Sequence, residues 1–263
     1  MAECEVERQG HVVVVTMNRP ERKNPLSPEM LCIMADTWRE ADADPDVRCV
    51  ILTGAGGTFC SGADLKAMAA GQQGSEKYKH RFDADPDLAW KALLRHYRLT
   101  KPLIAAVEGY AVAGGTEILQ ATDIRVAAET AIFGVTEVTR GLFPLGGSTV
   151  RLRRQIPYTL AADILLTGRH VKAPEAKEIG LISHVVPHGS ALAKAREIAD
   201  TICANGPLAV QAVLRSLRET EGLSEVDGLK VELQIGQPIF ATEDAREGPT
   251  AFAQKRKPEF KGR

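Results

Sequence analysis

The chain has 263 residues, 44% of them hydrophobic and 25% charged, values typical of a globular protein that buries a full core without disulfides or metal. Its 33 Lys and Arg residues balance 34 Asp and Glu residues, which excludes the basic excess of a general nucleic-acid or membrane-surface binder. The five cysteines form no C-x-x-C pair, the N-terminal residues are charged, and no run reaches the ~18 apolar residues of a membrane span. We therefore expect a soluble, cytoplasmic protein with reduced thiols and no secretory signal.

The first half of the chain has the pattern of strands alternating with helices. Ser27 and Pro28 predict a helix start, after which Met30, Met34 and Trp38 recur every four residues until Asp44-Pro45 ends the helix. Short apolar runs rich in β-branched residues are typical of strands buried on both faces of a sheet. These runs are residues 12–17, 47–53, 103–107 and 124–127.

The remaining segments differ in character. Shorter helices are expected from Leu65 and from Thr116, and the polar residues 69–90 predict a mobile lid or variable loop. Beyond about residue 150 the spacing of apolar residues is helical. The predicted helices there are 160–166, 174–179, 191–203, 207–218 and 224–235. The layout predicts an α/β fold whose last third is helical.

Several common signatures are incomplete. The turn Gly54-Ala55-Gly56 follows a strand, but Phe59 stands where a dinucleotide fingerprint needs its third glycine. The six histidines form no H-E-x-x-H motif or cluster with cysteines, and no G-x-S-x-G elbow occurs. Cys60 has no basic neighbour in sequence and is expected to be a small buried thiol. No metal site is predicted.

Two junctions between a strand and a helix combine small residues: Ser61-Gly62-Ala63-Asp64 and Ala113-Gly114-Gly115-Thr116-Glu117. The first N–H groups of a helix have no intrahelical acceptor, and small side chains leave room for a ligand oxygen beside them. Two such donors aimed at one point form an oxyanion hole. Either junction alone is better explained as an ordinary turn.

Glu117 and Glu137 are the candidate acid–base residues. Glu117 lies in the first turn of the helix after the second junction, where an acid also complements the helix dipole. Glu137 follows the apolar segment Phe133-Gly134-Val135-Thr136, which indicates a buried approach. Taken singly, each is better explained as a solvated or helix-capping acid.

Together with further matching stretches, these residues resemble the crotonase (enoyl-CoA hydratase/isomerase) superfamily, and their motifs are closest to those of enoyl-CoA hydratases. The resemblance covers essentially the whole chain in order. The stretches are Asn18-Arg19-Pro20 with Asn24, residues 59–66, 101–110 and 113–117, Phe133-Gly134, Glu137, Gly141, Pro144, Gly146-Gly147, and residues 166–168, 173–181, 247–248 and 251–256.

The resemblance implies an α/β fold built as a spiral of ββα units over residues 1–200, with a helical trimerisation region over residues 201–263. It implies a homotrimer or a homohexamer made of two trimers. By position, Ala63 and Gly114 match backbone oxyanion donors for a thioester carbonyl, and Glu117 and Glu137 match the two catalytic glutamates of hydratases. Coenzyme A is expected only as part of the substrate, with no metal or redox cofactor. The positions expected to bind the acyl-CoA are Arg19, Ser61, Asp64, Leu65, Lys66, Phe252 and Lys255.

Retention of both glutamates favours addition of water to an enoyl thioester, because isomerases of this superfamily typically manage with one. Glu117 is expected to orient and activate the water, and Glu137 to exchange the Cα proton. The same motifs leave three alternatives open: a dehydratase such as a carnitinyl-CoA dehydratase-like enzyme or an isomerase, an acyl-CoA thioester hydrolase, and a non-catalytic CoA-binding protein.

Overall fold

The core of the protein is a six-stranded sheet with the order β1-β2-β3-β4-β6-β9 in a computed structural model that describes residues 2–65 and 76–263. Only β1 and β2 pair antiparallel, and the other neighbours are parallel. The strands are β1 (Cys4–Gln9), β2 (Val12–Met17), β3 (Cys49–Gly54), β4 (Leu103–Val107), β6 (Ile124–Ala128) and β9 (His184–Val186).

A smaller sheet of three strands, in the order β5-β7-β8, lies beside the first. Its strands are β5 (Tyr110–Val112), β7 (Ile132–Gly134) and β8 (Val171–Lys172). The chain passes from β4 to β5 and from β6 to β7, so each pair contributes one strand to either sheet before a helix follows. This alternation produces a spiral of ββα units.

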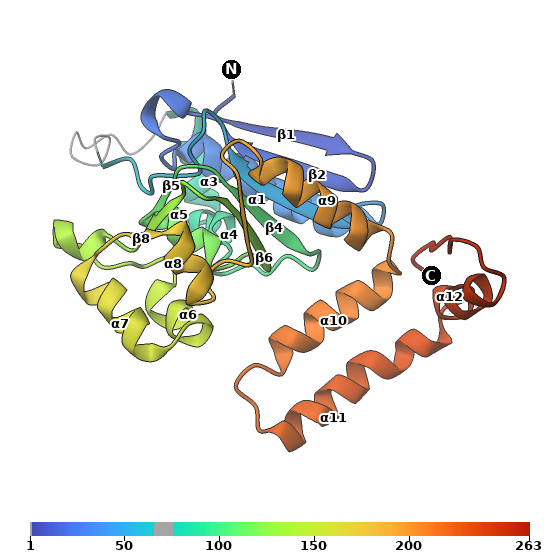
Figure 1. The fold of residues 1–263 in the computed structure, drawn as a ribbon. Helices are drawn as coiled ribbons and strands as arrows, with labels where there is room; N and C mark the ends of the chain where they lie inside the picture. Colours follow the sequence, from blue (N-terminus) through green and yellow to red (C-terminus); the bar gives the residue numbers. More distant parts are fainter. Residues whose placement is uncertain (1, 66–75) are drawn as a thin grey trace.

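Two helices cover opposite faces of the large sheet (Figure 1). Alternate residues of β2 face opposite ways, as the period of a strand requires: Val13 packs in the cluster that contains α1 (Pro28–Ala43), and Val14 packs in the cluster that contains α9 (Ala191–Cys203). Ser27 caps α1 as predicted, because its Oγ accepts the Met30 N–H at 3.2 Å. Small side chains at one face of α9 let the helix approach the strands closely.

The prediction of a loop over residues 69–90 is wrong for the part that the structure describes. Residues from 76 onward form α3 (Glu76–Ala84) and α4 (Leu88–Ala92). Although this segment is mostly polar, its partly buried aromatic residues Tyr78 and Phe82 are four residues apart, the spacing of one helix face. Two hydrogen bonds between charged groups also join Arg81 to Asp36 on α1, at 2.7 and 3.0 Å. Residues 69–75 and most of the helix expected from Leu65 lie outside the described residues.

Six further short elements precede α9 in the chain. They are η1 (Pro20–Arg22), α5 (Gly114–Leu119), η2 (Glu137–Arg140), α6 (Ser148–Gln155), α7 (Tyr158–Thr167) and α8 (Ala173–Glu178). Two of them, α5 and η2, bear the predicted acids in their first turns.

The C-terminal helices extend away from the sheets as a helical hairpin and a terminal helix (Figure 1). The elements are α10 (Pro207–Glu219), α11 (Glu225–Gly236), η3 (Gln237–Ala241) and α12 (Glu243–Ala253). Their tail returns toward the core, where Arg48 donates to Phe260 O at 2.8 Å. Large apolar side chains of this region are exposed: Val213, Leu217, Val226, Leu229, Leu233, Phe240 and Phe252. Among the described residues, no helix has the length and apolar character needed to cross a bilayer.

Substitution of Ala195 by Leu is expected to destabilise the protein by about 1–3 kcal/mol, because Ala195 is fully buried between α9 and the sheet and overpacking forces side chains or backbone to shift. The measurement is the midpoint of urea unfolding. Ala193→Leu is the matched control, since Ala193 is exposed on the same helix. Equal midpoints for the two variants would contradict the close packing of α9.

Candidate active site

A cavity of about 910 Å³ opens where α5, η2 and the loop after β3 meet. Its walls include apolar side chains such as Leu26, Trp90 and Phe143. Six of the residues predicted from the sequence line this one cavity: Ser61, Ala63, Leu65, Gly114, Glu117 and Glu137.

The two small-residue junctions lie in backbone contact at one wall of the cavity. A Cβ added to Gly62 would lie 2.9 Å from Gly114 N, and one added to Gly114 would lie 3.8 Å from Ala63 N. Within residues 2–65 and 76–263, neither Ala63 N–H nor Gly114 N–H has a protein acceptor. Two donors therefore lie side by side, which is the arrangement needed to hold one oxyanion.

This contact depends on residues without large side chains. A Cβ on Gly115 would lie 2.3 Å from Cys60 O, so only glycine permits the second junction to pack against the first. Ala113, which precedes Gly114, has φ 49° and ψ −126°, a conformation that costs a residue other than glycine about 1–3 kcal/mol. Its N–H is held by Gly134 O at 2.8 Å, which couples the strained residue to β7.

Glu117 is buried beneath the turn that precedes α6. Its side chain belongs to a residue only 5% exposed, and its Oε1 accepts the Ser148 N–H at 3.2 Å. Burial raises the pKa of Glu117, whereas hydrogen bonds from Ser148, Gly146 and Gly147 oppose that rise. A Cβ on Gly146 would lie 2.6 Å from Glu117 Oε2, so the turn fits closely around the carboxylate.

Glu137 begins η2 and has the more strongly perturbed carboxyl group. Burial, and then the negative charge of Glu117, raise its pKa to about 7, against a lowering hydrogen bond from its own backbone. Its Oε2 is buried without a hydrogen-bond donor among the described residues. Near neutral pH Glu137 therefore gains and loses its proton readily, whereas the backbone donors around Glu117 favour the ionised form of that carboxyl group.

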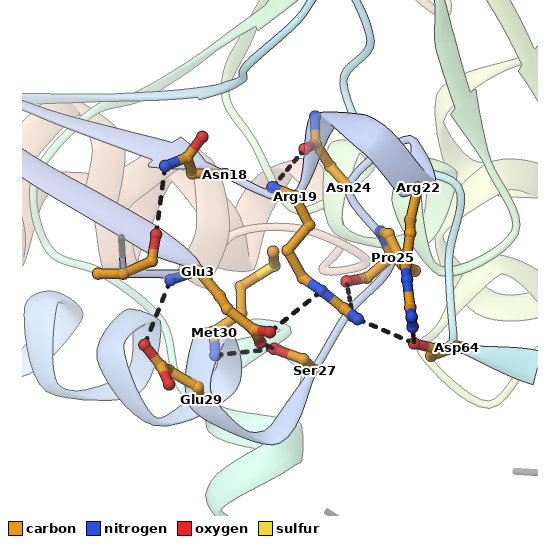
Figure 2. Close-up of polar contacts among 11 residues, drawn as sticks. Glu3, Asn18, Arg19, Arg22, Asn24, Pro25, Ser27, Glu29, Met30 and Asp64 are labelled. Atoms are coloured by element: carbon orange, nitrogen blue, oxygen red, sulfur yellow. Dashed lines mark hydrogen bonds and ion pairs between the residues drawn. The ribbon is translucent and has the colours of Figure 1, made fainter. Parts of the chain in front are cut away.

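Arg19 and Asp64, predicted to bind the substrate, do not line the cavity. Figure 2 shows the Arg19 guanidinium between Glu3 and Asp64, at 3.3 and 3.1 Å, with a further hydrogen bond to Pro25 O at 3.2 Å. Asp64 directly follows Ala63, the predicted oxyanion donor. The structure therefore gives the pair a role in holding the loop, and direct contact with substrate stays a prediction.

The remaining predicted binding residues lie elsewhere. Phe252 is 86% exposed on α12 and Lys255 follows that helix, on the opposite side of the core from α5 (Figure 1). Lys66 falls outside the described residues. Neither Phe252 nor Lys255 reaches the cavity of its own chain.

Sequence patterns missed several residues that line the cavity. Lys23 lies with its Nζ 4.4 Å from the centre of the Tyr110 ring, and both residues are at the wall of the cavity. Arg140 and His170 also line it. No local motif identifies these side chains, since they come from four separate segments of the chain.

Comparison with known proteins decides the family. The family model described as enoyl-CoA hydratase/isomerase matches residues 7–263. The chain belongs to the enoyl-CoA hydratase/isomerase family. This confirms the resemblance predicted from the motifs.

Individual members of the family are similar over their full lengths. The chain is 60% identical over 258 residues to enoyl-CoA hydratase EchA19 of Mycobacterium tuberculosis, covering 98% of this chain and 96% of that protein. It is 37% identical to the 2,3-dehydroadipyl-CoA hydratase of Escherichia coli, covering 100% of both.

Solved structures of the family share the fold. An enoyl-CoA hydratase from Mycobacterium tuberculosis has a TM-score of 0.90 at 39% identity, and EchA1 from Mycobacterium marinum has a TM-score of 0.89 at 41% identity. Each comparison covers 100% of both chains. The predicted α/β crotonase-type fold is therefore confirmed.

Removal of the Glu117 charge is expected to lower the pKa of Glu137 from about 7, because that charge is one of the two causes that raise it. The measurement is a pH titration of the protonated-carboxyl infrared band in wild type and in Glu117→Gln. The control is Glu232→Gln, on the exposed surface of α11. An unchanged titration in Glu117→Gln would show that the two carboxyl groups do not interact.

Proposed function

We propose that the protein is an enoyl-CoA hydratase, which adds water across the 2,3 double bond of a 2-enoyl-CoA. The single observation behind this proposal is that Glu117 and Glu137 line the same cavity as the paired N–H groups of Ala63 and Gly114. Membership of the enoyl-CoA hydratase/isomerase family and the hydratase names of the similar proteins support it.

The geometry accounts for each charge that the reaction develops. Attack on C3 moves negative charge to the thioester oxygen, which the Ala63 and Gly114 N–H groups stabilise. Glu117, held as an anion by the Gly146–Ser148 turn, accepts a proton from the attacking water. Glu137 supplies the proton that C2 gains. The two carboxyl groups exchange protons to restore the starting state, so oxygen and hydrogen from one water end on C3 and C2.

The alternative functions do not need every residue of the site. An isomerase that shuttles one proton between carbons needs only one of the two acids, and a thioester hydrolase would release free CoA, which a thiol reagent detects. A non-catalytic CoA-binding protein has no use for Glu137, whose carboxyl is buried at a cost in stability. Dehydration is the reverse of hydration and shares every residue.

The apolar wall formed by Leu26, Trp90 and Phe143 favours an apolar acyl group. We place the reaction in the degradation of fatty acids or related acyl-CoA compounds. A panel of 2-enoyl-CoA substrates of rising chain length, with one bulky ring-bearing member, followed by loss of enoyl absorbance, would define the acyl group. Free CoA release, measured in the same cuvettes, separates hydration from hydrolysis.

Binding of the CoA moiety is assigned, also as a proposal, to Lys66 and Lys255 near its 3′-phosphate, with Lys255 acting on a neighbouring subunit. No metal or redox cofactor is required in this scheme, since backbone donors and carboxyl groups handle every charge. The five free cysteines accord with action in the cytoplasm, where thiols stay reduced.

We further propose that the exposed apolar side chains of α10, α11 and η3 pack between copies of the chain in a homotrimer or homohexamer. Monomers rarely expose such an extended apolar surface. The region that bears these side chains, residues 207–241, lies within the predicted trimerisation region 201–263.

Substitution of Glu137 by Gln is expected to lower the turnover of crotonyl-CoA hydration about 100-fold or more, because the variant has no proton to exchange with C2. The matched control is Glu178→Gln on the exposed surface of α8, which should keep wild-type turnover. More than about a tenth of wild-type turnover in Glu137→Gln would refute the assigned role.

Leu233→Glu combined with Phe240→Glu is expected to convert the assembly to a 28.4 kDa monomer, since both side chains are exposed in a single chain and a buried unpaired charge is costly in an interface. Multi-angle light scattering gives the mass. Val6→Glu, at an exposed residue of β1, serves as the control. A wild-type chain that is monomeric at micromolar concentration would exclude the proposed trimer.

A further inference from the structure

Arg151 lies on α6, directly behind the turn that holds Glu117. Its Nη1 donates to Gly146 O at 3.3 Å, and its Nη2 donates to Leu94 O. The guanidinium also lies against Gly147, since a Cβ added there would be 3.3 Å from Arg151 Nη1. Arg151 thus joins the turn to the segment after α4.

One peptide unit connects Arg151 to Glu117. The carbonyl of Gly146 and the N–H of Gly147 belong to the same planar trans peptide, in which they point in opposite directions. Arg151 binds the carbonyl side, and the Gly147 N–H is among the hydrogen-bond donors that stabilise the Glu117 anion. A cation on the carbonyl polarises the peptide and strengthens its N–H as a donor.

Among the charges that act on Arg151, Glu117 is the carboxylate that favours the guanidinium cation. Burial, Arg98 and Arg95 lower the pKa of Arg151, and Glu117 raises it. Arg154 pairs instead with Glu221, and Arg218 pairs with Asp123. These groups line a separate cavity of about 530 Å³ behind the turn. On the cavity side, the charged or titratable groups that share the wall with Glu117 are Glu137, Lys23, Tyr110, Arg140 and His170.

We propose that Arg151 is a positioning residue for the hydration reaction: it fixes the Gly146–Ser148 turn and, through the Gly146–Gly147 peptide, keeps Glu117 ionised and correctly placed. The side chain does not line the active-site cavity, so it acts only through the turn. The inference rests on the proposed hydratase function. Because Arg151 lies on the Glu117 side of the pair, its positive charge favours Glu117 as the anion and Glu137 as the protonated acid.

The test compares Arg151→Gln and Arg151→Lys with Arg154→Gln, a matched arginine on the same helix that is exposed and pairs with Glu221. In the pH profile of kcat, the acid limb reports ionisation of the base. Loss of the cation in Arg151→Gln should raise the pKa of Glu117 and move this limb about half a unit to one unit toward higher pH. Arg151→Lys keeps the charge and should keep the limb in place.

Arg151→Lys loses the two-pronged contact with Gly146 and Leu94, so its kcat should fall about tenfold with KM within about twofold of wild type. An unshifted acid limb in folded Arg151→Gln would overturn the electrostatic role. Wild-type kcat in Arg151→Lys would overturn the positioning role, and this readout remains available if Arg151→Gln does not fold.

Hydrogen–deuterium exchange without substrate separates this inference from the proposed function. Amides of residues 146–148 should exchange about tenfold faster in Arg151→Lys than in wild type or Arg154→Gln. Unchanged exchange would overturn the inference even in an active hydratase. If wild type hydrates no enoyl-CoA but the exchange rises as expected, then the function fails while the contact between Arg151 and the turn stands.

Discussion

The site depends on one close contact between backbones, where Gly62 meets Gly114 and Gly115 meets Cys60. Side chains at these positions would push the two segments apart, and the N–H groups of Ala63 and Gly114 would no longer lie side by side. The positive φ of Ala113 belongs to the same constraint, because the chain must turn sharply from β5 into α5 to present the second donor. The large sheet offsets the cost of this strained conformation, because it fixes β4 and β6. The strands β5 and β7 of the smaller sheet follow directly after these two strands.

The same turn from β5 into α5 buries Glu117, and burial then sets the acid–base chemistry. The Glu117 carboxylate accepts hydrogen bonds from backbone N–H groups, whereas the buried Oε2 of Glu137 has no donor among the described residues. Glu137 therefore holds its proton more tightly than Glu117 does. The folded state binds the Glu137 proton more tightly than the unfolded chain does. Its contribution to stability is therefore complete below the ordinary glutamate pKa of 4.5 and is lost as pH rises through about 7. A carboxyl poised for proton exchange at neutral pH thus weakens the fold at alkaline pH, as expected where function opposes stability.

Sequence patterns identified the long elements and the core of the site, because both have local signatures. The strands β2, β3, β4 and β6 are short, nearly continuous apolar runs, and the capped helix α1 has apolar residues at a spacing of four. The strands β5, β7 and β8 are only two or three residues long, too short for any period to appear. Helix α3 was hidden because most of its residues are polar, and α4 is only five residues long, too short for a helical period to show. Glu117 and Glu137 were recognised through neighbouring small residues, whereas Arg151 acts across the fold on Leu94, a contact that no sequence window contains.

Small residues alone do not make the site rigid, since glycine increases the conformational freedom that folding must remove. Each of the two loops that form the site is instead held from outside by an arginine. Arg19 binds Asp64, the neighbour of the predicted oxyanion donor Ala63, and Arg151 binds Gly146, beside the donors to Glu117. Neither of these two guanidinium groups lines the cavity, whereas Arg140, which does, donates to Thr139 and to neither glutamate among the described residues. This separation matters for the proposed chemistry, because a guanidinium bound to Glu137 would favour the ionised carboxylate and remove the proton that the proposed reaction needs.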